Sequence, residues 1–370
     1  MRKLTDKYSL KNINLYFKIH LNVNSLLLTI IKNINRNPEK MVEIFVVQFF
    51  KKVTNDVYVV SFELFKIMIP TLILVKIAEI YGLVGVLTNL FGPVMIMMGL
   101  PAEMALAITT TMLTNPYAGI IVLASTPGIE ELTVAQTTIL ASFILFTHSI
   151  IIEAAISRQA GLSAGATIII RIFSGILFCT LLNSVFSTFE LFNQIAVLNL
   201  PEMSATPNLQ QWILDQIKGL IFIQIVIIVL ITLLEILRII GIEKIIRICL
   251  SPFLIILNIG QSASTIVVVG LTLGLGFGGG LMIKDVKQGL VAPRSAVGAL
   301  IFINLFHSLI EDTAILLLIG PSLMTIIVIR GLFVFALTFL LIKIFNNLPI
   351  DPYNKFLFSR SIRNLIKNLN

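Results

Sequence analysis

The stretch LFHSLIEDTAIL, residues 305–316, places a histidine and two adjacent carboxylates inside a run of leucine and isoleucine. A second stretch, FTHSIIIEAAIS at 146–157, carries the same His-Ser pair followed by a carboxylate. Both lie in a chain of which 57% of the residues are hydrophobic and only 12% are charged. Because soluble domains carry about 25% charged residues, this composition indicates an integral membrane protein built from helices.

The two stretches belong to one long internal repeat. When His148 is aligned with His307, the offset is 159 residues, and it aligns further residues of special type without a gap. The pairs are Gly82 with Gly241, Pro93 with Pro252, Gly119 with Gly278, Phe143 with Phe302, Gly161 with Gly320 and Arg171 with Arg330. Chance matches in apolar sequence would not align these residue types in one register, so we predict one structural unit used twice.

Each half is predicted to contain five helical segments. In order, they are a long apolar helix, a shorter segment with a proline, a broken stretch, and two apolar helices. Their ranges are 62–81, 83–99, 101–125, 133–158 and 164–186 in the first half, and 219–241, 242–258, 260–283, 293–318 and 322–345 in the second. Since a spanning helix needs about 20 residues, the second and third segments are candidates for interfacial or re-entrant elements.

Lys and Arg are concentrated at the two ends of the chain. Residues 1–60 carry ten Lys or Arg against four acids, 343–370 carry five against one, and 187–217 carry none. Cytoplasmic segments of membrane proteins collect Lys and Arg, so both termini are predicted to lie in the cytoplasm and 187–217 outside the cell (inner) membrane. The same rule explains the basic ends without a nucleic-acid partner, which we do not expect.

This charge distribution requires an odd number of membrane crossings in each half. Two homologous halves with odd crossings are inserted upside down relative to each other, as in many secondary transporters. We therefore expect an all-α polytopic membrane protein with two inverted repeats, each combining transmembrane helices with a broken or re-entrant hairpin. Its parts are a basic N-terminal segment 1–60, a first repeat 62–186, an external linker 187–217, a second repeat 219–345 and a basic tail 346–370.

The acids of the second repeat are predicted to face protein or water. The segment Ala299–Ile319 holds thirteen Leu, Ile or Phe, which together favour insertion by roughly 4 to 8 kcal/mol. If Glu311 and Asp312 were charged and faced lipid, they would cost roughly 5 to 7 kcal/mol, which nearly cancels that gain. Acids within a membrane segment are therefore functional candidates.

Helical spacing groups these polar residues into faces. On a continuous helix, His307 would share a face with Glu311, and Ser308 with Asp312; in the first half, Ser149 would share a face with Glu153, beside His148. A buried carboxylate can bind a proton, hold a cation or accept hydrogen bonds from a polar solute. The alternative is that these groups satisfy one another and lock the halves together. A zinc site is weakly indicated, because each helix carries a single histidine.

Two broken stretches offer further polar groups. In AITTTMLTNPYAG, 107–119, Asn115-Pro116 is predicted to break a helix and to expose the hydroxyls of Thr109, Thr110 and Thr111. In GLTLGLGFGGGLMIKD, 270–285, the glycines formally match a dinucleotide-binding fingerprint, but no soluble βαβ unit surrounds them. Glycines such as Gly276 and Gly278 are instead expected to permit close helix packing or an unwound hairpin tip. For both stretches, packing alone is the alternative.

The offset also pairs Lys76 with Glu235 and Glu79 with Arg238. Each segment then carries an opposite-charge pair three residues apart, with the signs exchanged, and such residues share a helix face. Local ion pairs in each segment and cross-pairing between the halves are both compatible with this pattern.

The stretches TNPYAG, HSIIIE and HSLIEDT, together with the glycine-rich hairpin, resemble the nucleoside-recognition, or Gate, family. This family includes concentrative nucleoside transporters, spore maturation membrane proteins and the membrane part of the bacterial ferrous-iron permease. The resemblance covers roughly 62–345 and implies paired repeats with hairpins and a polar site between them. It carries over as pathway residues Asn115, His148, Ser149, Glu153, His307, Ser308, Glu311 and Asp312. The chain lacks a Walker motif and any polar cluster that we can assign to a nucleobase.

The sequence therefore predicts a transporter or permease, not an enzyme, for a small polar, nucleoside-like solute, coupled to H⁺ or Na⁺ and without a resident cofactor. A divalent metal permease and a non-transporting membrane scaffold are the alternatives. Metal passage would depend on His148 and His307, and nucleoside passage on Asn115 and the Thr109–Thr111 run. The expected partners are the lipid bilayer and a solute or cation, and the sequence is also compatible with a homo-oligomer. The predicted pathway residues are Thr109, Thr110, Thr111, Asn115, His148, Ser149, Glu153, Gly276, Gly278, His307, Ser308, Glu311 and Asp312.

Overall fold

The computed structural model describes residues 38–204, 208–257, 259, 261–273, 281–282, 284–285, 288, 293–347 and 356–359. In these residues the secondary structure is helical, and β contacts are limited to two isolated bridges. The α-helices of the first half are α2 (Pro38–Ile80), α3 (Leu83–Met97), α4 (Ala105–Leu113), α5 (Pro116–Ala124), α6 (Val134–Thr147), α7 (Ile150–Ala160) and α8 (Ala164–Thr188). Those of the second half are α9 (Leu209–Ile240), α10 (Ile242–Ile256), α11 (Gln261–Leu273), α13 (Pro293–Phe306), α14 (Glu311–Leu316) and α15 (Arg330–Asn347).

Short turns of other helix types join several of these elements. They are the 3₁₀ turns η1 (Ala102–Met104), η2 (Ile129–Glu131) and η3 (Leu317–Ile319), and the π-helical turn η4 (Thr325–Ile329). Among the described residues, five helices are long and apolar enough to cross a membrane, or up to seven if each bent pair counts as one span. The chain is thus an all-α polytopic membrane protein, as its composition predicts.

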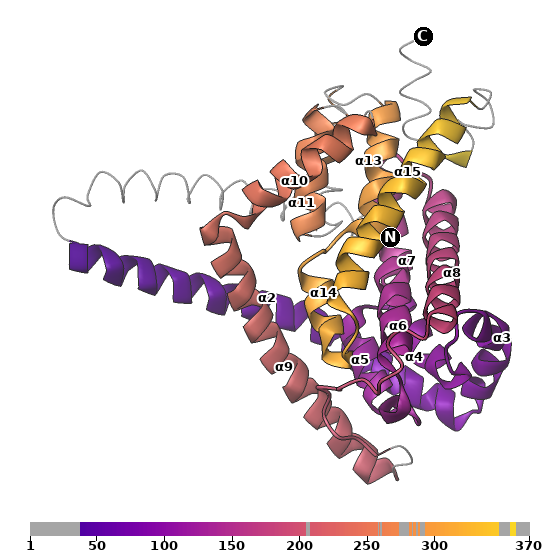
Figure 1. The fold of residues 1–370 in the computed structure, drawn as a ribbon. Coiled ribbons are helices and arrows are strands. Elements are labelled where there is room, and N and C mark those ends of the chain that lie inside the picture. Colours follow the sequence, from indigo (N-terminus) through magenta and orange to yellow (C-terminus); the bar gives the residue numbers. More distant parts are fainter. Residues whose placement is uncertain are drawn as a thin grey trace.

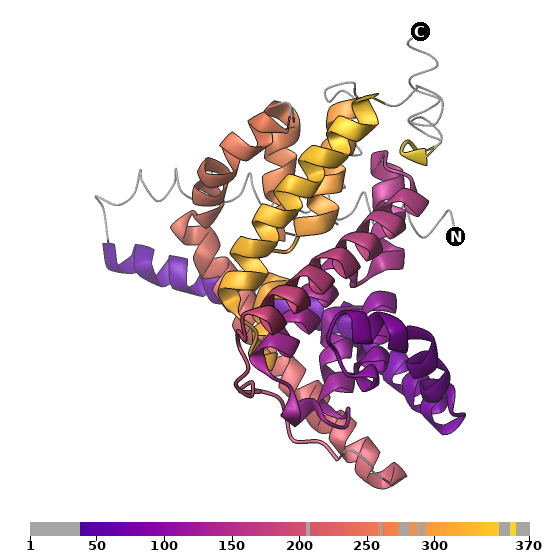
Figure 2. The same cartoon turned by 45° about the vertical axis from the view of Figure 1, so that its right-hand side comes forward.

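The two halves correspond element by element. Helices α3 and α10 begin and end at positions related by the repeat offset, and so do α6 and α13. Gly82 and Gly241 both adopt a left-handed conformation at the start of α3 and α10, the short second helix of each half, with φ of +72° and +84°. Glycine adopts this conformation without steric cost, which explains why it recurs here. Figure 2 shows the first repeat in indigo to magenta and the second in rose through orange to yellow.

The central helices of the two halves run in opposite directions (Figure 1). The start of α6 meets the end of η3, where the Thr137 hydroxyl lies 3.4 Å from the Gly320 carbonyl oxygen. The end of α7 meets α13, through a hydrogen bond between Ser157 and Asn304. The pairs α6–α7 and α13–α14 are therefore antiparallel, so the repeats are inverted relative to each other in space.

Each pair of central helices is broken at its His-Ser motif, and here the prediction of continuous helices over 133–158 and 293–318 is wrong. Ser149 and Ser308 adopt left-handed conformations, with φ of +51° and +47°. Helix α7 is bent by 41° from α6. Backbone groups freed by each break bond to a neighbouring helix: Ser149 N donates to Thr111 O, and Leu309 N donates to Leu271 O, both at 2.9 Å. These long-range bonds stabilise a break that local sequence alone does not specify.

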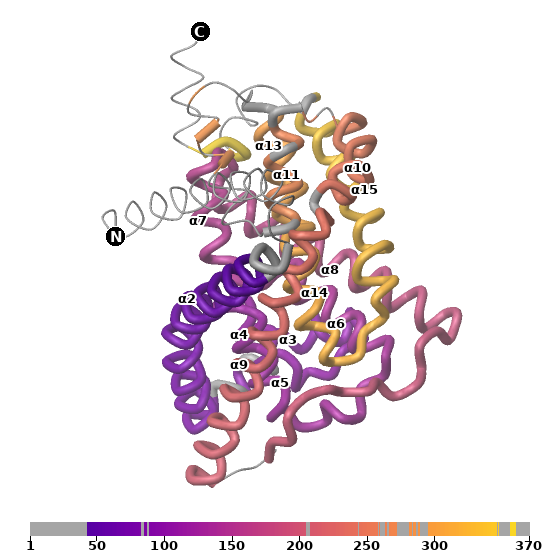
Figure 3. The backbone as a smooth tube through the Cα atoms, turned by 90° about the vertical axis from the view of Figure 1, so that its left-hand side faces the viewer, coloured from indigo at the N-terminus to yellow at the C-terminus, as the bar shows by residue number. Residues whose placement is uncertain are grey.

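Helices α2 and α9 lie side by side and extend away from the other helices (Figure 3). Many of their apolar side chains are exposed, as expected for helices that face lipid. Lys76 pairs with Glu79 and Arg238 with Glu235 within their own helices, at 2.9 and 3.0 Å. Two contacts link the two arms, α2 and α9: Lys52 lies 2.5 Å from Glu235, and the Lys76 Nζ lies 6.0 Å from the centre of the Trp212 ring.

The first repeat contains the bent and broken hairpin that its sequence predicts. The segment Asn89–Met97 and the segment Ala102–Leu113 meet at an angle of 116°. Helix α4 ends before Thr114, and Asn115 caps α5 by accepting a hydrogen bond from Ala118 N at 2.9 Å. A Cβ on Gly119 would lie 1.8 Å from the Thr111 Cγ2, so only glycine allows α4 and α5 to pack this closely.

The predicted external linker and basic tail are described in part. Residues of the linker pack along the starts and ends of central helices, since Ala196 N donates to Leu132 O and Asn199 N donates to Leu318 O. In the tail, Ser359 N donates to Gly161 O. The predicted N-terminal segment 1–60 falls partly into α2, which begins at Pro38. Residues 1–37 and 360–370, whose cytoplasmic location is predicted, lie outside the described residues.

Candidate functional site

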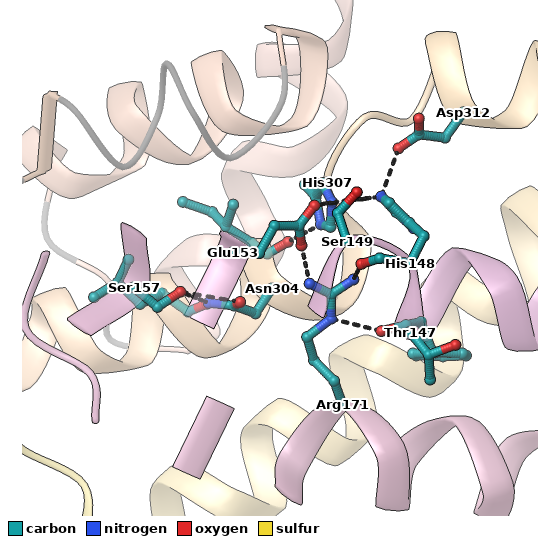
Figure 4. Close-up of polar contacts among 12 residues, drawn as sticks. Thr147, His148, Ser149, Glu153, Ser157, Arg171, Asn304, His307 and Asp312 are labelled. Carbon is teal, nitrogen blue, oxygen red and sulfur yellow. Dashed lines mark hydrogen bonds and ion pairs between the residues drawn. The ribbon is translucent and has the colours of Figure 1, made fainter. Parts of the chain in front are cut away.

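Four side chains from the two broken helix pairs meet in the interior (Figure 4). They are His148, Glu153, His307 and Asp312, which we call the histidine–carboxylate centre. The His307 Nε2 lies 2.9 Å from the Glu153 Oε1 and 3.1 Å from the His148 Nε2. The His148 Nε2 in turn lies 3.1 Å from the Asp312 Oδ2 and 3.4 Å from the Glu153 Oε1. All four residues are buried.

The centre follows the symmetry of the repeats. Glu153 and Asp312 occupy equivalent positions, as do His148 and His307. Each histidine therefore faces the carboxylate of the other half, and the two imidazoles meet each other. The pseudo-two-fold axis passes between the histidines. The helix breaks place both histidines there, because each follows the last residue of α6 or α13.

Both imidazoles are held by the same hydrogen bond. The Nδ1 of His148 lies 3.0 Å from Ile144 O, and the Nδ1 of His307 lies 3.1 Å from Ile303 O. A carbonyl oxygen can only accept, so each Nδ1 carries a proton. A ring that is neutral then presents a lone pair on Nε2, which repels both the other ring and the carboxylate oxygen that it faces. Two lone pairs cannot face each other at 3.1 Å without repulsion. A proton or a metal cation shared between the rings removes this repulsion.

Arg171 of α8 orients the first-half carboxylate. Its Nη1 donates to the Glu153 Oε2, its Nε donates to Phe146 O at 2.6 Å, and its Nη2 donates to His148 O at 2.9 Å. The side chain is fully buried. Arg171 thus fixes one oxygen of Glu153 and leaves the other to face the histidines, as groups behind a metal ligand commonly do.

Arg171 is the main residue of the site that we did not predict. The signal for it was present in the sequence, because the repeat aligns it with Arg330, and arginine is rare in apolar helices. Tyr117 was also missed. Its hydroxyl donates to the Glu311 Oε1 at 2.9 Å, and no spacing rule connects residues so far apart in the chain.

The prediction that Glu311 shares a face with His307 is wrong. The break between α13 and α14 changes the helical register, so Asp312 meets His148 while Glu311 contacts Tyr117. Ser149 stays at the break, where its hydroxyl donates to Thr114 O at 2.7 Å. Ser308 is buried, and its carbonyl accepts from Asp312 N.

The polar residues of the first broken stretch are engaged locally. The hydroxyls of Thr109, Thr110 and Thr111 each donate to a carbonyl three or four residues earlier in α4. Asn115 caps α5. These side-chain bonds lie within α4 and α5, while the Thr111 carbonyl accepts from Ser149 N, the residue after His148. Gly276 and Gly278 lie outside the described residues.

The spacing of the centre fits a tetrahedral metal ion. Ligand atoms of His148, Glu153 and His307 lie within 4.8 Å of one another, and their three separations are 3.1, 2.9 and 3.4 Å. Bonds of about 2.0 to 2.1 Å to a tetrahedral ion put neighbouring ligand atoms about 3.3 Å apart. Asp312, at 3.1 Å from His148, supplies a further carboxylate. Imidazole and carboxylate ligands suit divalent transition metals.

Comparison with known proteins adds one relative. The chain is 27% identical over 270 residues to the uncharacterized membrane protein YvoD of Bacillus subtilis (strain 168), covering 72% of this chain and 85% of YvoD. No protein-family model matches the chain, and no solved structure matches it. The similarity agrees with a membrane protein and assigns no activity.

Proposed function

We propose that the protein is a permease that passes a divalent transition-metal ion between its inverted repeats, with the histidine–carboxylate centre as the binding site. The observation that carries this proposal is the pair of Nδ1–carbonyl hydrogen bonds, which direct both Nε2 atoms toward each other and toward two carboxylates. In transporters with inverted repeats, the substrate site lies at broken helices between the repeats. The centre occupies the corresponding place in this fold.

Protons are the natural counter-ions at such a site. A metal ion needs unprotonated Nε2 atoms and ionised carboxylates, so its binding releases protons. Without a metal, protons on the imidazoles would pair with the carboxylates of the opposite half. This supports H⁺ as the coupling ion. The protein is then a non-enzymatic carrier of the cell membrane with both termini in the cytoplasm, as the distribution of Lys and Arg favours.

A nucleoside-like solute is the second candidate, because of the resemblance to the Gate family. It has less support from the geometry. The residues that would recognise such a solute, Asn115 and Thr109–Thr111, use their polar groups within α4 and α5. Membership of the Gate family is part of this proposal, and its ferrous-iron branch is compatible with a metal cargo.

The first experiment measures metal binding by the purified protein in detergent. Zn²⁺, Mn²⁺ and, under anaerobic conditions, Fe²⁺ are titrated while thermal stability and calorimetric heat are followed. A ligand present at 100 times its Kd stabilises the folded state by about 2.7 kcal/mol, so binding should raise Tm. We expect at least one metal to do so, and His148→Ala and His307→Ala each to abolish the effect.

Thr109→Val is the matched control, because its hydroxyl bonds only within α4. This variant should keep the metal response. The same variants are then compared for metal uptake into proteoliposomes. A Tm increase with nucleosides and none with metals would replace this proposal with the nucleoside reading. Metal binding without uptake would favour a metal-dependent scaffold.

A further inference from the structure

Arg330 is a buried cation for which the described residues supply no hydrogen-bond partner. Its side chain is fully buried, yet its Nε, Nη1 and Nη2 all lack a hydrogen bond. Its guanidinium carbon lies 4.9 Å from the centre of the Phe306 ring, and Asp312 is near enough to attract it electrostatically without a hydrogen bond. Removing a guanidinium from water without hydrogen bonds is costly. Its repeat equivalent, Arg171, has three hydrogen bonds.

A local difference in helix type explains why Arg330 is unpaired. The turn η4, Thr325–Ile329, immediately before Arg330, is π-helical, whereas the equivalent residues 166–170 lie within the regular helix α8. A π-turn holds more residues than an α-turn. One residue corresponds to about 100° of rotation, so Arg330 points in another direction than Arg171 does. Single π-turns inside helices are frequent at functional sites.

Asp312, the repeat equivalent of the Glu153 carboxylate that binds Arg171, is present but binds no arginine among the described residues. Asp312 precedes Arg330 by the same 18 residues by which Glu153 precedes Arg171. Its Oδ2 has one close ionic neighbour, the His148 Nε2 at 3.1 Å. Glu153, in contrast, contacts Arg171 and both histidines. The second half thus contains both members of an ion pair that only the first half has formed.

We propose that Arg330 is a positioning residue that competes with the bound cation for Asp312. When the π-turn η4 rewinds into an α-helix, Arg330 rotates toward Asp312 and forms the pair that Arg171 and Glu153 form in the first half. Asp312 then leaves His148, and the centre loses one carboxylate. When a cation occupies the centre, Asp312 returns to it and the π-turn is restored. The cation affinity of the centre therefore depends on the winding of a single helical turn.

This proposal rests on the proposed function for the identity of the cation, but the pairing of Arg330 with Asp312 can be tested without any metal. Hydrogen exchange is measured on a peptide covering 325–330 in the metal-free wild type and in Asp312→Asn. In the variant Arg330 has no carboxylate to pair with, so pairing no longer stabilises the α-helical form of the turn. The backbone amides of 325–330 should therefore exchange faster in the variant. The equivalent peptide, 166–171, lies in a regular helix and should be unaffected.

Metal affinity provides the second readout. Arg330→Gln removes the competitor, so Mn²⁺ or Zn²⁺ should bind about tenfold more tightly, which corresponds to about 1.4 kcal/mol. Simple charge repulsion would also tighten binding. The same substitution is therefore repeated in the Asp312→Asn background, where competition has no target and the gain should vanish. Arg330→Lys, which keeps the charge for folding, should fall between wild type and Arg330→Gln.

Two results would overturn the proposal. One is equal tightening by Arg330→Gln in both backgrounds, which would mean a static charge effect. The other is identical exchange at 325–330 in wild type and Asp312→Asn. If the wild type binds neither metal, the proposed function fails, and the exchange experiment alone decides whether Arg330 pairs with Asp312.

Discussion

The two halves of the centre differ in how their arginines are used. In the first half, Arg171 binds Glu153 and two backbone carbonyls. In the second, Arg330 is equally buried but has no hydrogen bond among the described residues, and the Asp312 side chain contacts His148 and Ser308 without an arginine. The residue types are alike, so the difference comes from geometry: a regular α8 on one side and a π-turn before α15 on the other. Two halves with similar sequences can thus differ in their hydrogen bonds, with a fully bonded arginine in one half and an unbonded arginine in the other.

Loss of each arginine should give the largest contrast. Arg171→Met leaves Glu153 without its cation and two carbonyls without donors, and should lower the free energy of unfolding by about 3 to 5 kcal/mol. With the centre occupied by a metal ion, Arg330 has no hydrogen bond among the described residues, so Arg330→Met removes an unpaired buried charge and should not lower the free energy of unfolding. Chemical unfolding in detergent measures both. Equal losses would show that Arg330 is paired in the predominant state.

Substitution of the two carboxylates should also lower the free energy of unfolding more in the first half than in the second, but with a smaller difference than for the arginines. Glu153→Gln disrupts contacts with Arg171 and both histidines, and should cost about 2 to 3 kcal/mol. Asp312→Asn weakens the contacts of Asp312 with His148 and Ser308 and should cost about 1 kcal/mol. The same unfolding measurement applies, at a pH where carboxylates are ionised. A greater loss for Asp312→Asn would contradict the asymmetry described here.

A third contrast concerns a hydrogen bond between the halves that has no symmetric copy. Ser157 and Asn304 are both buried and bond to each other at 2.9 Å, whereas their repeat equivalents are Leu316 and Leu145. Asn304→Leu leaves the Ser157 hydroxyl unsatisfied and should cost about 1 to 2 kcal/mol. Adding Ser157→Ala should recover part of this loss. Strict additivity of the two substitutions in a double-mutant cycle would show that the pair contributes nothing.

The smallest effect is expected at the arms. Lys52→Met breaks the ion pair between α2 and α9 and should cost about 0.5 kcal/mol, because the Lys52 side chain is partly exposed. Lys76→Met breaks a pair within α2 whose Glu79 is half exposed and removes a contact with the Trp212 ring of α9, and should cost no more than about 0.5 kcal/mol. Unfolding in low salt compares the two. A larger effect of Lys76→Met would place the coupling of the arms at their other end.

Several features of the fold could be predicted from the sequence because they depend on composition and local pattern. The apolar content predicts a helical membrane protein, and the offset that aligns His148 with His307 predicts matching elements such as α3 with α10. The cost of charge in lipid made Glu311 and Asp312 candidates, and the repeat and the family resemblance added His148, Glu153 and His307. The structure brings His148, Glu153, His307 and Asp312 together. The sequence could not show whether Thr109–Thr111 and Asn115 bind a solute or cap a helix, because a hydroxyl or amide can form hydrogen bonds with the backbone as well as with a solute.

By itself, the sequence determined that the protein lies in a membrane, that it uses one unit twice, and that polar groups lie within both copies. Only the tertiary structure decided which polar groups meet. The breaks at Ser149 and Ser308 depend on hydrogen bonds to Thr111 and Leu271, which local sequence cannot reveal. Because of those breaks, Asp312 and not Glu311 points toward the centre. They also bring the Nε2 atoms of two histidines from distant helices to 3.1 Å from each other. Register after a break follows from packing, because residue spacing fixes side-chain direction only along an unbroken helix.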